Sequence, residues 1–457
     1  MNYEIDKRIL QYLESVEAGA PRACREQIAL AEHVRKCFAS DDIYTDTVQL
    51  DKYLSLVKYF PYERLFPWEE FLLALWDCTY WRRTGRPRWK TLFAMVGRGA
   101  GKDGFIAFDG ACSVSPYNPV SRYNVDICAN NEDQAKRPML DLVDVLETPR
   151  WEAKLDKHYY HTKEVVQGRK NKGIMKGHTN NPKGRDGLRS GKVILNEVHQ
   201  YENYDNITVF ITGMGKVGQP RVGFFTSNGD VSDGPLDDYL ARGRRILFDG
   251  EEDDGFLPFI CCLDSKEQVH DPENWPMANP SLPYLPDLQA EIREEYKEWL
   301  EHPEQNVSFL TKRFGIRSGA KEISVTDYEK IRATNQPLPD MRGWQCTVGI
   351  DYAELNDWAA VNLHFRQGER RFDINHAWIC LQAKTLARIK APWREWAKQG
   401  LVSAVDDVSI HPRLLAEYIR RAAGMYNIRM MAMDNFRWTL LSDEMKKIGF
   451  DANDKSR

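Results

Sequence analysis

The chain has 457 residues, of which 42% are hydrophobic, and its formal net charge is −4. Because this length exceeds what a single hydrophobic core usually supports, we expect two domains. The slightly acidic balance excludes a protein that is basic throughout, so any contact with nucleic acid must come from local cationic patches. From the N-terminus, residues 1–60 are predicted to be helical, since Tyr3–Leu13 and Pro21–Ala39 carry apolar residues at helical spacing.

An aromatic-rich segment, Phe60–Trp76, comes next, and Pro67 within it can begin a helix. Its rings are suited to flanking an adenine base, but such a stripe more often packs a helix against a sheet. The sequence alone leaves both interpretations open.

Residues Lys90–Ala107 read as a buried strand, a glycine turn ending in Gly-Lys, and the first turn of a helix. Backbone N–H groups in such a turn converge on an anion, and Lys102 can reach the β- and γ-phosphates of a nucleotide. This pattern predicts a P-loop that binds and hydrolyses a nucleoside triphosphate. Two positions depart from G-x-x-x-x-G-K-[ST], since Val96 replaces the first glycine and Asp103 the final hydroxyl residue. The alternative is a surface turn after a core strand.

The following segments alternate between strand and helix. Tyr123–Ala129 is strand-like, and Glu132–Leu146 has the apolar spacing of a helix, as expected for a parallel βαβ arrangement. Residues Gly168–Arg189 are rich in cations, Gly and Asn and are predicted to be a loop. This loop either contacts phosphates, of DNA or of a neighbouring subunit's nucleotide, or is simply a solvated charged segment.

Two further apolar strands each end in groups suited to phosphate chemistry. The first ends at Asn196 and Glu197, of which Glu197 is the candidate base that activates water. The second, in Arg221–Gly229, opens into a polar turn whose Thr226 and Asn228 are suited to sensing the γ-phosphate. Each strand alone fits an ordinary sheet core, but their order after the glycine turn favours an NTPase.

The two motif departures lead to a hypothesis about the metal. The position after Lys102 has gained a carboxylate in Asp103, whereas Asn196 stands where an Asp is usual. We therefore expect Asp103 to take a direct or water-mediated place at Mg²⁺, with Asn196 orienting a coordinated water. The alternative is that Asp103 only caps the new helix.

After the polar turn the composition changes. Asp249–Gly255 is an acidic loop, Pro272–Pro286 is rich in proline, and Leu288–Leu300 is a charged helix. We assign this stretch, residues about 250–320, to a small lid or linker subdomain of an ATPase domain spanning 61–320.

A second domain is expected at 341–457, where several strands follow one another. Asp351 lies at the end of one strand and Asp434 at the end of another. Two such acids on neighbouring strands suit two-metal phosphodiester hydrolysis, because Mg²⁺ or Mn²⁺ ions about 4 Å apart need shared carboxylates. This pattern resembles an RNase H-like nuclease, although the two acids would also suit plain strand ends. Further candidate ligands are Asp357, Asp406 and Asp407.

The whole order of motifs resembles the large terminase subunit of tailed bacteriophages, a family that packages DNA into capsids. The matching residues are Pro67–Glu69, Arg98–Lys102, Asn196–His199, Thr226–Gly229, Gly349–Asp351, Trp393–Gly400 and Ala432–Asp434. The implied fold is α/β: a P-loop NTPase, with helices on both faces of a parallel sheet, followed by an RNase H-like α/β nuclease domain.

The resemblance also implies roles for individual residues. The residues expected to bind ATP and its Mg²⁺ are Arg98, Gly99, Ala100, Gly101, Lys102, Asp103, Asn196, Thr226 and Asn228. Glu197 would activate water, and the turn from Thr226 would couple hydrolysis to movement. Arg185 or Arg189 would act as a finger that reaches a neighbouring subunit's ATP.

Partners and nuclease residues are implied in the same way. Family members form a homo-oligomeric ring on the capsid portal protein, receive double-stranded DNA from a small terminase subunit, and cut it with the C-terminal nuclease. Asp351 and Asp434 match the first two nuclease acids, as catalytic and metal-binding residues. The third acid of the family lies beyond the equivalent of Gly449-Phe450, and the sequence ends at Arg457. We therefore expect an impaired nuclease beside an intact ATP site.

Two other classes of protein stay open. One is a helicase-like P-loop ATPase with a non-nucleolytic C-terminal module, and the other is a non-catalytic nucleotide-binding assembly protein. The nine cysteines show no C-x-x-C spacing, and no apolar stretch approaches the about 20 residues of a membrane span. Together with these features, the resemblance implies a virus-encoded protein of the host cytoplasm that contacts no membrane and is not a virion component.

Overall fold

The computed structural model describes residues 5–178, 188–229, 231, 234–303, 305–317, 333–353, 358–383, 386, 389, 391–434 and 437–450. The chain divides into two compact units, Met1–Val325 and Thr326–Arg457. The residues expected to form a lid, 250–320, fall within the first unit. No helix in these described ranges combines the length and the apolar character that crossing a membrane requires.

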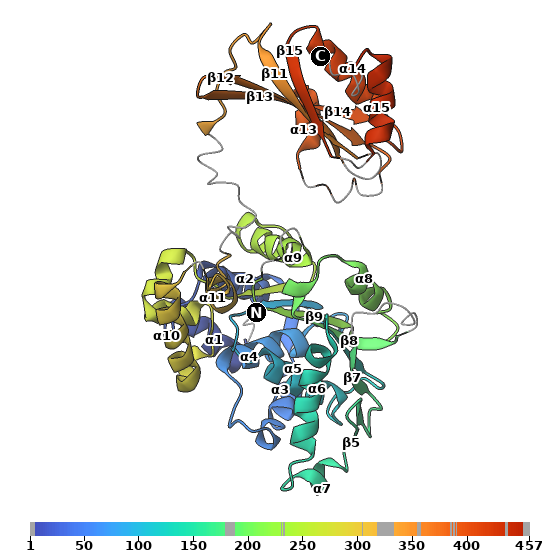
Figure 1. Cartoon of the computed structure of the whole chain (residues 1–457). Helices are drawn as coiled ribbons and strands as arrows, with labels where there is room; N and C mark the ends of the chain where they lie inside the picture. The colour runs from blue at the N-terminus through green and yellow to red at the C-terminus, as the bar shows by residue number, and fades with distance from the viewer. Residues whose placement is uncertain are drawn as a thin grey trace. The chain divides into compact units, whose positions relative to one another are not determined.

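The first unit begins with helices that pack on a central sheet (Figure 1). Its N-terminal elements are α1 (Lys7–Ala18), α2 (Arg25–Ser40), β1 (Ile43–Thr45), α3 (Thr47–Leu54), η1 (Val57–Tyr59), α4 (Pro67–Leu72), η2 (Leu73–Asp77) and β2 (Thr79–Trp81). Asp6 caps α1 by accepting a hydrogen bond from the Arg8 N–H, and Gly19 ends the helix in a left-handed conformation. As predicted from the sequence, Pro67 is the first residue of a helix.

The central sheet has eight strands in the order β10-β3-β9-β8-β4-β7-β6-β5. They are β3 (Thr91–Met95), β4 (Asn124–Cys128), β5 (Tyr159–His161), β6 (Val166–Gly168), β7 (Ile174–His178), β8 (Ser190–Asn196), β9 (Arg221–Thr226) and β10 (Phe256–Ile260). The six strands from β10 to β7 are parallel, and β6 and β5 add an antiparallel end. Every residue of β8 is buried, as expected for a parallel strand covered on both faces.

Helices cover both faces of this sheet, because alternate residues of its strands enter two different cores. Leu92 and Ala94 of β3 pack in the core formed with α5 (Lys102–Val114) and α6 (Glu132–Leu146). Phe93 and Met95 pack in the core formed with α8 (Asp205–Thr212) and α9 (Pro235–Arg244). The remaining short helical elements of this part are α7 (Glu152–Leu155), η3 (Val198–Gln200) and η4 (Arg245–Asp249).

The prediction of a loop over Gly168–Arg189 was wrong for Ile174–His178, which form β7 alongside β4. Met175 is fully buried, and its side chain fills the space next to Gly110 of α5. This burial outweighs the low strand propensity of the Lys and Gly residues in the segment. Residues 179–187 lie outside the described part of the chain.

After β10, a small subdomain has a core of its own. Its elements are η5 (Lys266–His270), η6 (Pro272–Met277), η7 (Leu282–Tyr284), α10 (Pro286–Glu301) and α11 (Ser308–Phe314). Trp275, Trp299, Phe309 and Phe314 pack together within it. Leu263 donates its N–H to the Phe314 carbonyl, which fastens the end of the subdomain to the strand that precedes it.

The second unit is built on a five-stranded sheet with the order β14-β13-β12-β11-β15. Its elements are β11 (Gln345–Tyr352), β12 (Trp358–Gln367), β13 (Arg370–Cys380), α13 (Trp393–Lys398), β14 (Val402–Val405), α14 (Pro412–Ala423), β15 (Asn427–Met433) and α15 (Trp438–Lys447). β11 pairs antiparallel with β12 and parallel with β15. The predicted strands that carry Asp351 and Asp434 are therefore neighbours.

Candidate functional site

The carboxyl ends of β3, β9 and β8 meet at one edge of the first sheet, because the three strands are parallel neighbours. The glycine turn follows β3, Thr226 is the last residue of β9, and Asn196 is the last residue of β8. The sheet thus brings together residues from three separate segments that were each predicted to serve a nucleotide site. This is the edge at which parallel α/β sheets place their ligands.

The glycines of the turn are required by its geometry. Gly101 precedes α5 with φ of 98°, in the left-handed region that favours glycine. A side chain at Gly97 would lie 2.4 Å from the carbonyl oxygen of Arg313. Val96, where the motif usually has its first glycine, is buried and continues the ladder by donating its N–H to the Thr226 carbonyl. The Val96 side chain therefore lies in the core and does not occupy the space inside the turn.

Lys102 is the first residue of α5, and only 8% of its surface is exposed. Its Nζ lies 3.9 Å from Glu197 Oε1 and forms no hydrogen bond within the described residues. The ammonium group of a lysine carries three hydrogen-bond donors. An anion bound in the turn would satisfy them, so the residues present fit a nucleotide phosphate.

Glu197 follows β8 in a left-handed conformation, with φ of 54°. Its carboxylate oxygen Oε2 lies 3.1 Å from His199 Nδ1. Burial alone would raise the pKa of Glu197, but the hydrogen bond from His199 and the charges of Lys102 and Arg98 outweigh burial and lower it. A carboxylate that stays ionised beside Lys102 has the charge state that a general base needs.

His199 joins Glu197 to the end of β9. Its Nδ1 lies 3.2 Å from Thr226 Oγ1, and its backbone N–H donates to the same oxygen at 3.0 Å. Because the Thr226 hydroxyl gives its one proton to the Ser227 carbonyl at 2.6 Å, the proton of the imidazole contact resides on His199 Nδ1. The sequence assigned no role to His199, although the motif that ends β8 contains it.

Asp103 and Asn196 are in direct contact. Asn196 Nδ2 donates to Asp103 Oδ1 at 2.9 Å, and Asn196 Oδ1 accepts the Glu197 N–H at 3.1 Å. The N-cap of α5 is Gly101, so the Asp103 carboxylate is turned toward Asn196 and does not cap the helix. Carboxylate and amide oxygens are the ligands that Mg²⁺ prefers, and their placement beside Lys102 and Glu197 fits a nucleotide-bound metal.

The small subdomain forms hydrogen bonds with the glycine turn, and the sequence did not indicate this contact. The Gly97 N–H donates to Ala278 O, and the Arg98 N–H donates to Lys312 O. Arg313, buried and held by Glu291 and Glu295, donates to the Arg98 carbonyl. Asn228 also contacts this subdomain, through Gly315 O at 2.8 Å. The small subdomain therefore helps to hold the backbone of the glycine turn in place.

Arg189, one of the two predicted finger residues, is exposed and immediately precedes β8. Asn196 ends the same strand, so Arg189 lies at the opposite edge of the sheet, about 23 Å away at 3.3 Å per residue. It cannot reach the glycine turn of its own chain. Arg185 lies outside the described residues.

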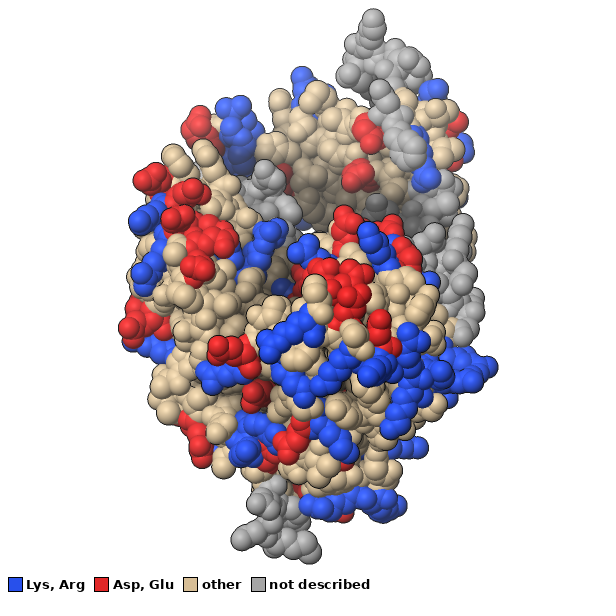
Figure 2. Space-filling view, turned by 90° about the horizontal axis from the view of Figure 1, so that it is seen from below, with Lys and Arg blue, Asp and Glu red and all other residues tan. Residues whose placement is uncertain are grey.

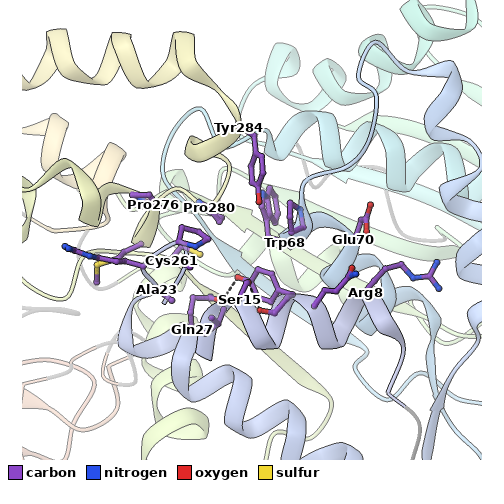
Figure 3. Close-up of a pocket in the computed structure, with 18 of the residues that line it drawn as sticks. Arg8, Ser15, Ala23, Gln27, Trp68, Glu70, Cys261, Pro276, Pro280 and Tyr284 are labelled. Carbon is purple, nitrogen blue, oxygen red and sulfur yellow. Dashed lines mark hydrogen bonds between the residues drawn. The ribbon is translucent and has the colours of Figure 1, made fainter. Parts of the chain in front are cut away.

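A pocket of about 200 Å³ lies between α1, α4 and the small subdomain (Figure 3), and no residue of the glycine turn lines it. Trp68 and Tyr284 form part of its wall, and Trp68 Nε1 donates to Ser281 Oγ, which in turn donates to the carbonyl of Ala100. The other bulky residues of the aromatic segment, among them Phe71 and Trp76, are fully buried in the core. Most of that segment therefore packs helix against sheet.

Many Lys and Arg residues are exposed between Arg150 and Lys176, a stretch that includes α7 and β5 at the lower end of the first unit in Figure 1. They are Arg150, Lys154, Lys157, Lys163, Arg169, Lys170, Lys172 and Lys176. Figure 2, seen from that end, shows Lys and Arg in bands beside acidic side chains. The described part of the predicted cationic segment contributes the last four of these residues.

In the second unit, Asp351 and Asp434 border one shallow hollow of about 420 Å³. Gly349, Ala360 and Ala432 provide its floor, and Asn362 lies at its rim. Two exposed carboxylates on adjacent strands supply oxygen ligands for hard divalent cations, so the residues present fit Mg²⁺ or Mn²⁺.

The structure does not bring the other acids to this hollow. Asp406 and Asp407 follow β14, which is separated from β11 by β13 and β12, about 14 Å across the sheet. Asp406 instead accepts a hydrogen bond from Gln382. Asp357 lies outside the described residues.

The fold and these sites define a P-loop NTPase unit joined to an RNase H-like nuclease unit. The chain belongs to the large terminase subunit family: the model of its ATPase domain matches residues 67–243, and the model of its endonuclease domain matches residues 250–453. The predicted family and fold class are thus confirmed. The endonuclease match includes the small subdomain that packs here against the nucleotide turn.

Individual relatives are distant. Protein YmfN of Escherichia coli (strain K12) is 21% identical over 281 residues, which cover 57% of this chain and 60% of that protein. The terminase large subunit of Lactococcus phage p2 is 23% identical over 383 residues, covering 79% of this chain and 67% of that protein. The crystal structure of the HK97 bacteriophage large terminase shares the fold, with a TM-score of 0.58 at 18% identity over 89% of this chain and 84% of that one.

Proposed function

We propose that this protein is the motor subunit that uses ATP to move double-stranded DNA into a procapsid and cuts the DNA with a two-metal nuclease. The observation that carries the proposal is the meeting of Lys102 and Glu197 at 3.9 Å, at the edge where three parallel strands end. Membership of the large terminase family favours this function over a helicase-like ATPase or a non-catalytic assembly protein.

In the proposed ATP site, the turn from Arg98 to Lys102 binds the phosphates and Glu197 accepts a proton from the attacking water. Asp103 would hold Mg²⁺ directly or through a water that Asn196 orients, and the bound ion would neutralise charge on the phosphates. Thr226 and Asn228, in the turn after β9, sense the γ-phosphate, and His199 connects Thr226 to Glu197. Asn228 joins this turn to the small subdomain through Gly315, which supports its role in coupling hydrolysis to movement. We propose that the adenine base binds in the pocket lined by Trp68 and Tyr284.

In the proposed nuclease site, Asp351 and Asp434 hold Mg²⁺ or Mn²⁺ ions that stabilise the attacking and leaving oxygens. The two residues lie on neighbouring strands and border the same hollow. We propose domain bounds of 1–60 for the helical region, 61–320 for the ATPase with its lid at about 250–320, and 341–457 for the nuclease. The division of the chain into Met1–Val325 and Thr326–Arg457 supports the boundary between the ATPase and the nuclease.

The proposed partners are those of a packaging motor: double-stranded DNA, a small terminase subunit, a capsid portal protein and further copies of this chain in a ring. Arg189 lies far from its own glycine turn, so it fits a role only toward a neighbouring subunit's ATP, and Arg185 remains its alternative. The proposed location is the host cytoplasm.

Packaging with purified components tests this function. The chain is mixed with portal-bearing procapsids, small subunit, duplex DNA and ATP, and DNA that resists added nuclease is measured. We expect protection with ATP, and none for Glu197→Gln, which keeps the side chain's size and removes its charge. Protection that does not depend on ATP, or that survives Glu197→Gln, would show that another machine moves the DNA.

A further inference from the structure

The two faces of the nuclease sheet differ, because helices cover one of them and leave much of the other open. Along β12, Val361, Leu363 and Phe365 are buried in the core formed with α14 and α15. The alternate residues point the other way and are partly or fully exposed. Figure 1 shows α14 and α15 together on one side of the sheet. On the opposite side, α13 covers the region of Ile379 and Val402, and the described residues leave the rest of that face open.

This open face contains the proposed nuclease acids and continues away from them in register. Asp351 lies opposite Ala360, and Gly349 lies opposite Asn362. Farther along, Arg366 of β12 pairs with Arg371 of β13. Ala360 and Arg366 are six positions apart on one strand, so the acids and the arginine pair are separated by about 20 Å.

Arg366 and Arg371 form a like-charge pair directly opposite each other on neighbouring strands. Both are exposed, and both donate to the carbonyl of Gly368 in the hairpin turn. Within the described part of the chain, no carboxylate forms an ion pair with either of them. Like charges in this position destabilise a sheet, and an anion bound between them would remove the cost. A phosphate, which guanidinium groups bind through paired hydrogen bonds, has the required chemistry.

Gly349 supplies an independent observation. It lies inside a regular strand with no positive φ, and a Cβ there would meet only the Asn362 Cβ, at 4.0 Å. Neither conformation nor crowding within the chain therefore requires glycine, although glycine weakens a strand interior. With Ala360 and Ala432 beside it, the position leaves bare backbone next to Asp351. Such a floor lets another backbone approach closely.

We propose that duplex DNA lies along this open face, with the scissile strand over Gly349 between Asp351 and Asp434, and with a phosphate about 20 Å away held between Arg366 and Arg371. That distance corresponds to about six base-pair steps of a duplex. The inference rests on the proposed nuclease function for the chemistry at the acids. The arginine pair contacts DNA whether or not cleavage follows.

The test uses the full chain and a labelled duplex of defined length. The double variant Arg366→Ala/Arg371→Ala removes the pair, and Arg420→Ala/Arg421→Ala removes two exposed cations from α14, on the covered side of the same sheet. We expect the first variant to raise KM for duplex cleavage about tenfold with kcat within twofold, and to reduce the salt slope of duplex binding by about 1. The control should match the parent protein in all three quantities.

Identical behaviour of the two double variants would overturn the proposal, and so would a loss confined to single-stranded DNA. A second pair of variants probes the floor: Gly349→Leu should lower kcat/KM for duplex at least tenfold at unchanged thermal stability, whereas Ala404→Leu on the edge strand β14 should not. If the parent chain cleaves no DNA with Mg²⁺ or Mn²⁺, the nuclease function fails, while the salt slope still decides whether the arginine pair binds the duplex.

Discussion

The side-chain amide of Asn196 donates a 2.9 Å hydrogen bond to the carboxylate of Asp103. These residues occupy the two positions at which the chain departs from the usual P-loop and strand-end motifs, and the fold brings them into contact across 93 positions of sequence. The hydroxyl expected after the lysine and the carboxylate expected on the strand have become a carboxylate and an amide. The exchange preserves one negative charge and places it on α5.

We expect this pair to control the metal dependence of ATP hydrolysis. Asp103→Ala should raise the Mg²⁺ concentration for half-maximal turnover by about 10- to 100-fold, because the site loses its carboxylate oxygen. Asp133→Ala, an acid in the first turn of α6, is the matched control and should leave the Mg²⁺ dependence unchanged. Titration of turnover against Mg²⁺ makes the comparison. An unchanged midpoint for Asp103→Ala, or faster turnover for Asp103→Ser, would remove Asp103 from the metal site.

His199 should set the acid limb of the ATPase pH profile. Burial favours a high pKa for Glu197, and the contact with His199 helps to lower it below the ordinary value of about 4.3. In the parent protein Glu197 thus loses its charge only below that pH. His199→Ala removes a lowering contribution, so the pKa of Glu197 rises and activity should fall off at higher pH. Measured kcat profiles with coincident acid limbs would contradict this link.

Lys192 should be a determinant of stability. It is fully buried in β8 and binds Asp109 of α5 at 2.5 Å and Asp77 of η2 at 2.7 Å. Burial and the neighbouring Asp77 raise the pKa of Asp109, and the charge of Lys192 opposes that rise. Lys192→Met leaves buried acid without its counter-charge, and we expect a loss of about 3–5 kcal/mol in the free energy of unfolding. Urea titration should show less than about 0.5 kcal/mol for the exposed Lys163→Met.

Asp351 and Asp434 should be needed for cleavage and not for ATP turnover. Replacing either by Asn keeps its size and removes the charge that holds divalent cations. We therefore expect Mg²⁺- or Mn²⁺-dependent plasmid nicking, which should already be slow in the parent chain, to fall at least about 100-fold. ATP hydrolysis, which resides in the other unit, should stay within twofold. Asp443→Asn, on the exposed side of α15, is the control. Nicking that persists in Asp351→Asn would place the nuclease site elsewhere.

The strands that position the nucleotide site could be predicted from the sequence because each one contains an uninterrupted apolar run, Leu92–Met95 in β3, Val193–Leu195 in β8 and Val222–Phe225 in β9. Every residue of β8 and β9 is buried, so the signal does not depend on which face a residue occupies. β7 was missed because Lys176 and Gly177 interrupt its apolar pattern, and only the packing of Met175 under α5 reveals the strand.

The contacts that complete the nucleotide site join residues that are far apart in the sequence, so they could not be predicted. Arg313 reaches the Arg98 carbonyl across 215 positions of sequence, and the fit of Gly97 against the backbone at Arg313 depends on how the small subdomain docks. No local pattern encodes such contacts. His199 was within reach of the sequence, since it follows Glu197 by two residues, but its role emerged only when β9 placed Thr226 beside it.

The central claim is that a nucleoside triphosphate binds at the glycine turn and is hydrolysed there. Steady-state ATP turnover of the full chain with duplex DNA tests it most directly, comparing Lys102→Ala with Lys136→Ala, a lysine of α6 that pairs with Glu132 and Glu164. We predict turnover by the parent chain, at least about a 100-fold loss for Lys102→Ala, and a change within twofold for Lys136→Ala. Equal turnover by the two variants would contradict the account.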